Sequence, residues 1–129
     1  NEDATRLMRT LGVDGLIVGS ITAWDPYQPP TLGLAFQLFI RRQPSESDPA
    51  ASPEAIPLAA AQAAGVFDAS DHTTLQSLAR FADGRTHPTS AYGADLYLVK
   101  MDLYTKFVAH QLLANLLRNE HDRLAMTNE

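Results

Sequence analysis

Two aspartates and a histidine lie close together in the segment Asp68-Ala69-Ser70-Asp71-His72. Carboxylate and imidazole groups are zinc ligands, and a zinc-bound water can hydrolyse a substrate. These residues therefore give one hypothesis, a small metal-dependent hydrolase that uses Asp68, Asp71 and His72. The alternative is structural: Asp68 stabilises a turn, while Ser70 and Asp71 begin a helix. The next histidine, His87, is separated from this cluster by a predicted helix and a loop.

Other catalytic or cofactor-binding patterns are absent from the chain. There is no Gly-x-x-x-x-Gly-Lys phosphate loop, no Gly-x-Ser-x-Gly elbow and no cysteine. His110 and His121 share a helix face, but a spacing of eleven residues separates them by about 16 Å along the axis, too far for one metal ion. We therefore predict no catalytic residues, no metal and no cofactor.

Composition limits the partners that the chain can bind. Its 129 residues, of which 45% are hydrophobic, suit a single folded domain. The net charge is -5, and no basic run occurs, which disfavours nucleic acid and anionic lipid as partners. No stretch approaches the roughly eighteen apolar residues that span a bilayer.

Two strand patterns between residues 14 and 42 organise the domain. Alternating apolar residues run from Leu32 to Ile40, a period that is typical of a half-buried strand. The preceding segment, from Gly15, is apolar on both faces, so we expect it to lie inside the sheet. The proline-rich corner Asp25 to Pro30 interrupts pairing and predicts a wide hairpin.

The remaining pattern predicts an α/β (α+β) fold. It has a small mixed or antiparallel sheet of about three to four strands, and a long carboxy-terminal helix packs on that sheet. The expected helices are residues 3–11, ended by Gly12, residues 70–83, capped by Ser70, and residues 94–123. We also predict a loop at 43–57, a helical turn at 58–64 and a third strand at 64–69. A further strand is expected before Asn1.

Aromatic side chains suggest a contact surface, because interface hot spots are rich in them. Trp24, Tyr27, Tyr92 and Tyr97 could form such a patch; alternatively, Trp24 closes the end of the sheet and Tyr97 packs under the long helix. The prolines stiffen the hairpin corner, so a partner would bind it at a small entropic cost. The predicted partner-binding residues are Trp24, Asp25, Tyr27, Pro29 and Pro30.

The segment Leu11-Gly12-Val13-Asp14-Gly15-Leu16-Ile17-Val18-Gly19-Ser20-Ile21 resembles a signature of bacterial envelope proteins. Those proteins include the curli-secretion lipoprotein family, the penicillin-binding-protein activator lipoproteins and the amino-terminal domain of the Tol translocation protein. The corner Asp25 to Pro30 is similar to the Asp-Pro-Tyr-x-Pro-Pro corner of other envelope lipoproteins. The chain departs from the better-known members in its long 43–57 loop and in its missing first strand.

The resemblance implies a non-enzymatic domain of the periplasm or outer membrane of a Gram-negative-type bacterium. A lipidated cysteine upstream of Asn1 would anchor it, and its partners would be other envelope proteins or copies of itself. We therefore expect it to act through protein–protein contacts, and we expect a homo-oligomer. A second hypothesis is a structural subunit of a filament or surface assembly, in which an unpaired sheet edge recruits the next copy.

Overall fold

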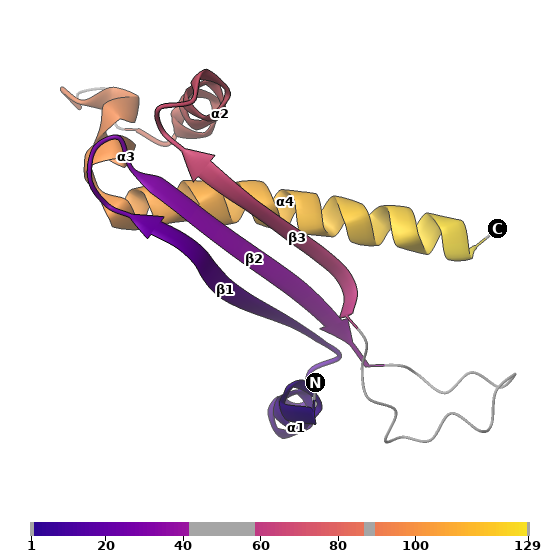
Figure 1. Ribbon diagram of the computed structural model, residues 1–129. Helices are drawn as coiled ribbons and strands as arrows, with labels where there is room; N and C mark the ends of the chain where they lie inside the picture. The colour runs from indigo at the N-terminus through magenta and orange to yellow at the C-terminus, as the bar shows by residue number, and fades with distance from the viewer. Residues whose placement is uncertain (1, 42–58, 87–89, 129) are drawn as a thin grey trace, which may run out of the picture.

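The computed structural model describes residues 2–41, 59–86 and 90–128, so the predicted loop at 43–57 lies outside the described residues. The described residues form a three-stranded sheet, with one helix before the strands in the sequence and the other helices after them (Figure 1). The elements in chain order are α1 (Glu2–Leu11), β1 (Gly15–Asp25), β2 (Thr31–Ile40), β3 (Ala59–Asp68), α2 (His72–Ala82), the 3-10 turn η1 (Gly93–Asp95), α3 (Leu96–Val99) and α4 (Met101–Thr127).

The strands are antiparallel and lie in the order β1-β2-β3. The alternation predicted from Leu32 is confirmed, because Leu32 and Leu34 are buried beneath α4. Residues opposite one another on adjacent strands share a face, so this inner face can be followed across the sheet. It carries Ile17, Gly19, Ile21 and Trp24 on β1, Leu32, Leu34, Phe36 and Leu38 on β2, and Ala61, Ala63, Gly65 and Phe67 on β3.

The core forms where α4 crosses the inner face of β2 and β3 (Figure 1). Five α4 side chains, each at most 2% exposed, point into it: Tyr104, Phe107, Val108, Leu112 and Leu116. Small residues on β3 allow the helix to approach closely; a Cβ added to Gly65 would lie 3.4 Å from the Leu112 side chain. The predicted α+β fold, with a long carboxy-terminal helix on an antiparallel sheet, is thereby confirmed.

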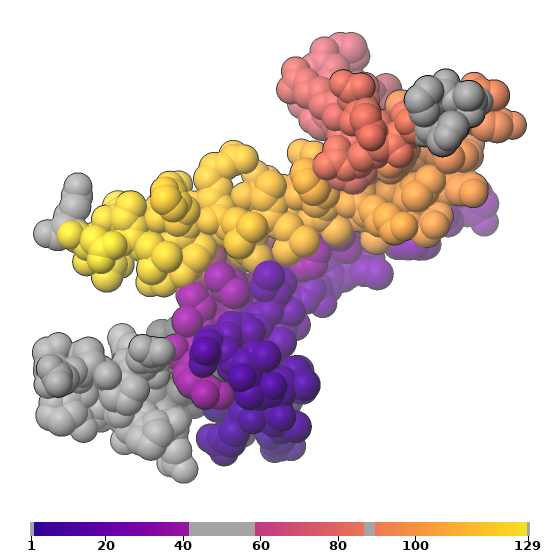
Figure 2. Space-filling view, turned by 180° about the vertical axis from the view of Figure 1, so that it is seen from behind, coloured from indigo at the N-terminus to yellow at the C-terminus, as the bar shows by residue number. Residues whose placement is uncertain are grey.

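The prediction that the first strand lies inside the sheet is wrong, because β1 is an edge strand. Its apolar run suggested burial on both faces, but Ile17 and Val18 keep 42% and 43% of their surface exposed. α4 covers the other two strands, and α1 packs at the beginning of β1 (Figure 1). Figure 2 shows α1 standing well apart from the rod of α4.

The alanine-rich segment expected to be a helical turn is instead the first half of β3. Alanine favours helices, but here pairing with β2 and packing under α4 outweigh that preference. The third strand is accordingly longer than the predicted 64–69 segment.

Two helix boundaries also differ from the predictions. α2 is capped by Asp71 and not by Ser70, since the Asp71 carboxylate accepts a hydrogen bond from the Thr73 backbone N–H at 3.3 Å. The predicted long helix is divided, because Lys100 is extended (φ -117°, ψ 107°) between α3 and α4. By contrast, Gly12 adopts the left-handed conformation (φ 64°) expected of a residue that ends α1.

The apolar residues of α4 are buried on one face of the helix and exposed elsewhere. Tyr104, Val108, Leu112 and Leu116 form the buried row, whereas Leu117 is 61% exposed. Beyond Glu120 every described residue of α4 is exposed, so the last turns extend past the sheet. Within the described residues, no helix has the length and apolar character that crossing a bilayer requires.

Candidate contact surface

Large apolar side chains form an uncovered strip along the inner face of β1. We call Ile17, Ile21 and Trp24 the β1 strip; they are 42%, 63% and 53% exposed. They lie on the same side of the sheet as α4, but the helix passes over β2 and β3 and leaves them open. An exposed, contiguous apolar surface of this kind is typical of an interaction site.

A glycine interrupts the β1 strip and is covered by a neighbouring ring. Gly19 lies opposite Phe36, whose ring leans across β1; a Cβ added to Gly19 would come within 2.7 Å of it. Ile17 and Ile21 flank this position, each two residues from Gly19 on the same face. The surface is therefore continuous and apolar from Ile17 to Ile21, although its central residue has no side chain.

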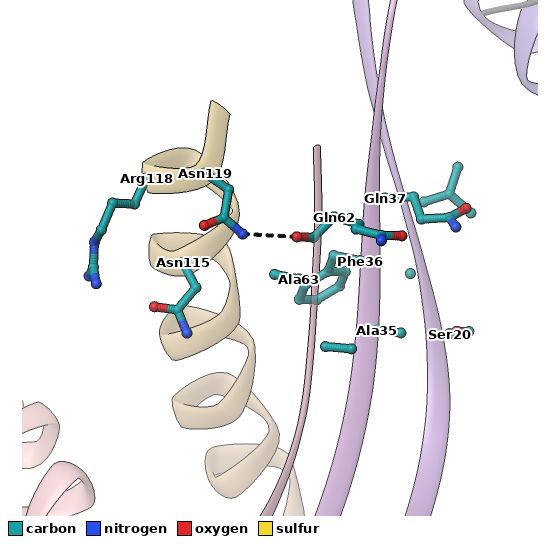
Figure 3. Close-up of a pocket in the computed structure, with 12 residues that line it drawn as sticks. Ser20, Ala35, Phe36, Gln37, Gln62, Ala63, Asn115, Arg118 and Asn119 are labelled. Atoms are coloured by element: carbon teal, nitrogen blue, oxygen red, sulfur yellow. Dashed lines mark hydrogen bonds between the residues drawn. The ribbon is translucent and has the colours of Figure 1, made fainter. Parts of the chain in front are cut away.

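A groove of about 730 Å³ separates this surface from α4. Its strand side is lined by apolar residues such as Phe36 and Ala63 and by polar ones, Ser20, Gln37 and Gln62. Its wall on α4 is formed by Asn115, Arg118 and Asn119. Figure 3 shows the Asn119 side chain reaching β3, where its Nδ2 donates to the Gln62 carbonyl oxygen at 3.0 Å. Arg118 points away from the strands in the same view. The groove therefore combines apolar and polar groups, as the surfaces that bind other proteins do.

The outer edge of β1 presents unpaired backbone groups. The Asp14 carbonyl oxygen accepts from the Arg41 N–H at 2.8 Å, so residue 14 directs its backbone groups toward β2. Because this direction alternates along an antiparallel strand, the N–H and C=O groups of Gly15, Ile17, Gly19 and Ile21 point outward. The register is regular as far as Ile21, after which a bulge bends the strand.

Nothing in the sequence of this edge discourages pairing with another strand. Natural edge strands are commonly protected by charged residues, especially lysine, or by proline. Residues 15–24 contain neither a charged residue nor a proline. Within the described residues, no further strand pairs with this outer edge. It is therefore an open site for β-strand addition.

The hairpin corner predicted to bind a partner lies at the far end of β1. Tyr27 is 81% exposed, and its N–H donates to the Asp25 carboxylate at 3.1 Å, which holds the turn. Pro29 follows a cis peptide bond and is exposed. Pro30 is fully buried, and its carbonyl oxygen accepts from the Ala69 N–H at 2.9 Å, so it anchors the corner instead of presenting a surface. Trp24 joins this corner to the β1 strip.

The structure gives each member of the Asp68, Asp71 and His72 cluster a local role. The Asp68 carboxylate accepts from the Ser70 hydroxyl at 2.6 Å and from its N–H at 2.8 Å, and these bonds lower the pKa of Asp68. Asp71 caps α2, and His72 accepts a hydrogen bond from the Gln76 side chain at 3.0 Å. Among the described residues, no three groups of the metal-ligating types gather at one point.

The remaining predicted aromatic and histidine positions are dispersed. Tyr97 is 7% exposed, and its ring meets Phe81 edge to face at 5.7 Å, so it is a packing residue. Tyr92 is exposed and is the N-cap residue of η1. The His110 ring lies beside Phe81 with ring centroids 4.9 Å apart and planes tilted by 53°, and His110 stays exposed.

Sequence reasoning missed Ile17 and Ile21 as contact residues. The apolar run was interpreted as evidence of a central strand, whereas the structure leaves it on an edge. One signal was visible in the sequence. Gly19 lies between Ile17 and Ile21 on the inner face of the run, at a position where a buried central strand would normally carry a side chain.

Comparison of the chain with known protein families, curated proteins and solved structures gave no match.

Proposed function

We propose that this chain is a non-enzymatic docking domain, and that another protein covers the β1 strip and the outer edge of β1. One observation carries the proposal: an edge strand with neither charge nor proline in residues 15–24 presents three large apolar side chains that are 42% to 63% exposed. Leaving this surface in water is unfavourable by roughly 25 cal/mol for each Å² of apolar area. A partner that covers the surface recovers that free energy.

The arrangement of charge and polarity supports a protein partner. The chain carries a net charge of -5, which disfavours nucleic acid and anionic lipid surfaces. The groove beside the β1 strip is lined by apolar residues such as Phe36 and Ala63 and by polar groups, among them the amides of Asn115 and Asn119. Such a surface matches an interface in which apolar contacts supply affinity and polar groups at the rim supply orientation.

We further propose a place in the bacterial cell envelope, on the outer membrane or in the periplasm, with a lipid anchor upstream. This part rests on the resemblance of residues 11–21 and of the Asp25 to Pro30 corner to envelope lipoproteins. The partners would then be other envelope proteins or copies of the chain. Membrane fractionation of the producing cells, with globomycin treatment to block lipoprotein processing, tests this placement.

Size measurement of the native complex tests the docking surface. We expect the double variant Ile21→Lys/Trp24→Ala to elute as a smaller particle than the unaltered protein when each is extracted in mild detergent. The reason is that a lysine on the inner face would have to lose water on binding, and the largest apolar contact would be gone. Tyr27→Ala, made separately, measures the contribution of the hairpin corner.

Val66→Lys is the matched control for this experiment. Val66 is 62% exposed on β3 and lies opposite Gly33 on the other face of the sheet, so its replacement leaves the proposed surface intact. We expect this control to elute like the unaltered protein. Equal particle sizes for the double variant and the unaltered protein would contradict the docking proposal.

A further inference from the structure

We infer that the β1 edge pairs with the β1 edge of a second copy of this chain, antiparallel, about a two-fold axis at Gly19. This inference rests on the proposed function and names the partner of the same surface. The two three-stranded sheets would join into one sheet of about six strands, with both α4 helices on the same side.

The backbone of β1 has the hydrogen-bonding phase that this arrangement requires. The outward groups belong to Ile17, Gly19 and Ile21, as the Asp14–Arg41 bond and the alternating register establish. A two-fold axis at Gly19 places Gly19 opposite its own copy and Ile17 opposite Ile21. In each of these pairs, both residues direct their N–H and C=O groups toward the other copy, so about six backbone hydrogen bonds form. A shift of the register by one residue would oppose outward groups with inward groups.

The side chains are also self-complementary about this axis. Ile17 of one copy meets Ile21 of the other twice, and β-branched pairs across antiparallel strands are stabilising. The position between these pairs holds two glycines without side chains. The ring of Phe36 already leans over Gly19, so the two rings occupy the space above the axis. Between Gly15 and Ile21, where the register of β1 is regular, this pairing brings no two charged residues together.

The two edges of the sheet are not equally available, which favours β1–β1 pairing over head-to-tail growth. The β3 edge lies along α4, and its Gln62 carbonyl oxygen already accepts from Asn119. Pairing of β1 with β3 of the next copy would compete with that bond and would continue without closure. Pairing of β1 with itself uses the open edge of both copies and ends at a dimer.

Charge replacement at the paired positions tests both the partner and the register. Two double variants differ only in the sign of one charge: Ile17→Lys/Ile21→Lys and Ile17→Lys/Ile21→Glu. In the proposed dimer, the first opposes lysine with lysine twice, whereas the second opposes lysine with glutamate twice. Sedimentation equilibrium over a dilution series, run on the purified chain, measures the dissociation constant of each.

We expect the unaltered chain to show a monomer–dimer equilibrium. The lysine–lysine variant should weaken the dimer by at least about tenfold, and the lysine–glutamate variant should recover about tenfold relative to it. Both positions are 42% or more exposed in the single chain, so the two variants should melt at similar temperatures. The melting curves, followed by circular dichroism, provide the control for folding.

Three results would overturn the inference: a monomeric unaltered chain at every concentration, equal association of the two charge variants, or open-ended growth with concentration. The docking proposal is judged separately, by the native complex. If the purified chain stays monomeric while Ile21→Lys/Trp24→Ala still shrinks the extracted complex, then a different protein covers the β1 strip and only the dimer is rejected.

Discussion

At the scale of single residues, Tyr104 connects the core of α4 to the sheet. Its side chain is fully buried, and its hydroxyl donates to the Phe67 carbonyl oxygen at 3.0 Å. Removal from water raises the pKa of Tyr104 to about 12, and the negative charge of Asp68 adds to the effect. The ordinary value is 10.0, so the folded protein holds this proton more tightly than the unfolded chain does.

Stability should therefore fall with alkaline pH in a specific window. The contribution of Tyr104 is complete below pH 10 and is lost as the pH rises toward about 12. We expect Tyr104→Phe to cost about 1 kcal/mol at neutral pH, through the lost hydrogen bond, and to flatten the decline above pH 10. Urea unfolding at a series of pH values measures both effects.

Tyr27→Phe is the matched control for that experiment. It removes a hydroxyl from a tyrosine that is 81% exposed at the hairpin corner and has no core contact. An alkaline decline in Tyr104→Phe as steep as in the unaltered protein would show that this hydroxyl does not sense the buried environment.

Asp71 gives a second prediction at the residue scale. As the cap of α2, it satisfies the Thr73 N–H, so Asp71→Ala should lower the free energy of unfolding by about 1 kcal/mol. Asp71→Ser keeps an oxygen at the cap and should restore most of the loss. Equal destabilisation by alanine and serine, measured by thermal unfolding, would mean that the cap is not the role of this residue.

At the scale of elements, the bulge of β1 is fitted to a glycine on β2. Thr22 is the extra residue at the bulge, and a Cβ added to Gly33 would come within 2.5 Å of its hydroxyl oxygen and 3.0 Å of the Ala23 backbone nitrogen. Gly33→Ala should therefore destabilise the protein by about 1–3 kcal/mol. Chemical denaturation measures the change.

Gly15→Ala provides the comparison for Gly33→Ala. At Gly15 an added Cβ meets its nearest neighbour only at 3.8 Å, an ordinary contact distance, and the φ angle is not in the left-handed region. We expect this variant to be as stable as the unaltered protein. If both alanine variants unfold alike, the close fit between Gly33 and the bulge does not contribute to stability.

The elements that could be predicted are those whose pattern is local. The period-two alternation of β2, the proline corner and the left-handed Gly12 are all visible in short segments, and the structure confirms them. The predicted position of β1 was wrong because an apolar strand has the same sequence pattern whether or not another element of the fold covers it. The alanine-rich start of β3 was wrong because its strand state comes from β2 and α4, not from its own propensities.

The candidate site was only partly predictable. Trp24 and Tyr27 are exposed, as a contact role requires, while Pro30 is buried. Ile17 and Ile21 became candidates only when the strand order placed them on an edge and α4 was found over the other strands. The exposure of a residue depends on whether another element covers it, and only the whole fold determines that.

At the scale of the whole molecule, α4 makes the sheet asymmetric. The helix buries the inner face of β2 and β3 and supplies a side chain to the β3 edge, while the inner face and outer edge of β1 stay open (Figure 1). The β3 side of the sheet is thereby covered by α4, whereas the β1 side is accessible from solvent. We propose that a neighbouring protein covers this open side along β1.

Photocrosslinking along the strands tests that claim most directly. A photoreactive amino acid is placed singly at Ile17, Ile21 or Trp24, and at Val66 and Thr73 as exposed controls on β3 and α2. On illumination of the cells that make the protein, we predict protein adducts at the three β1 positions and none at the two controls. Adducts at the controls alone, or equal adducts at all five positions, would contradict the claim that β1 is the contact surface.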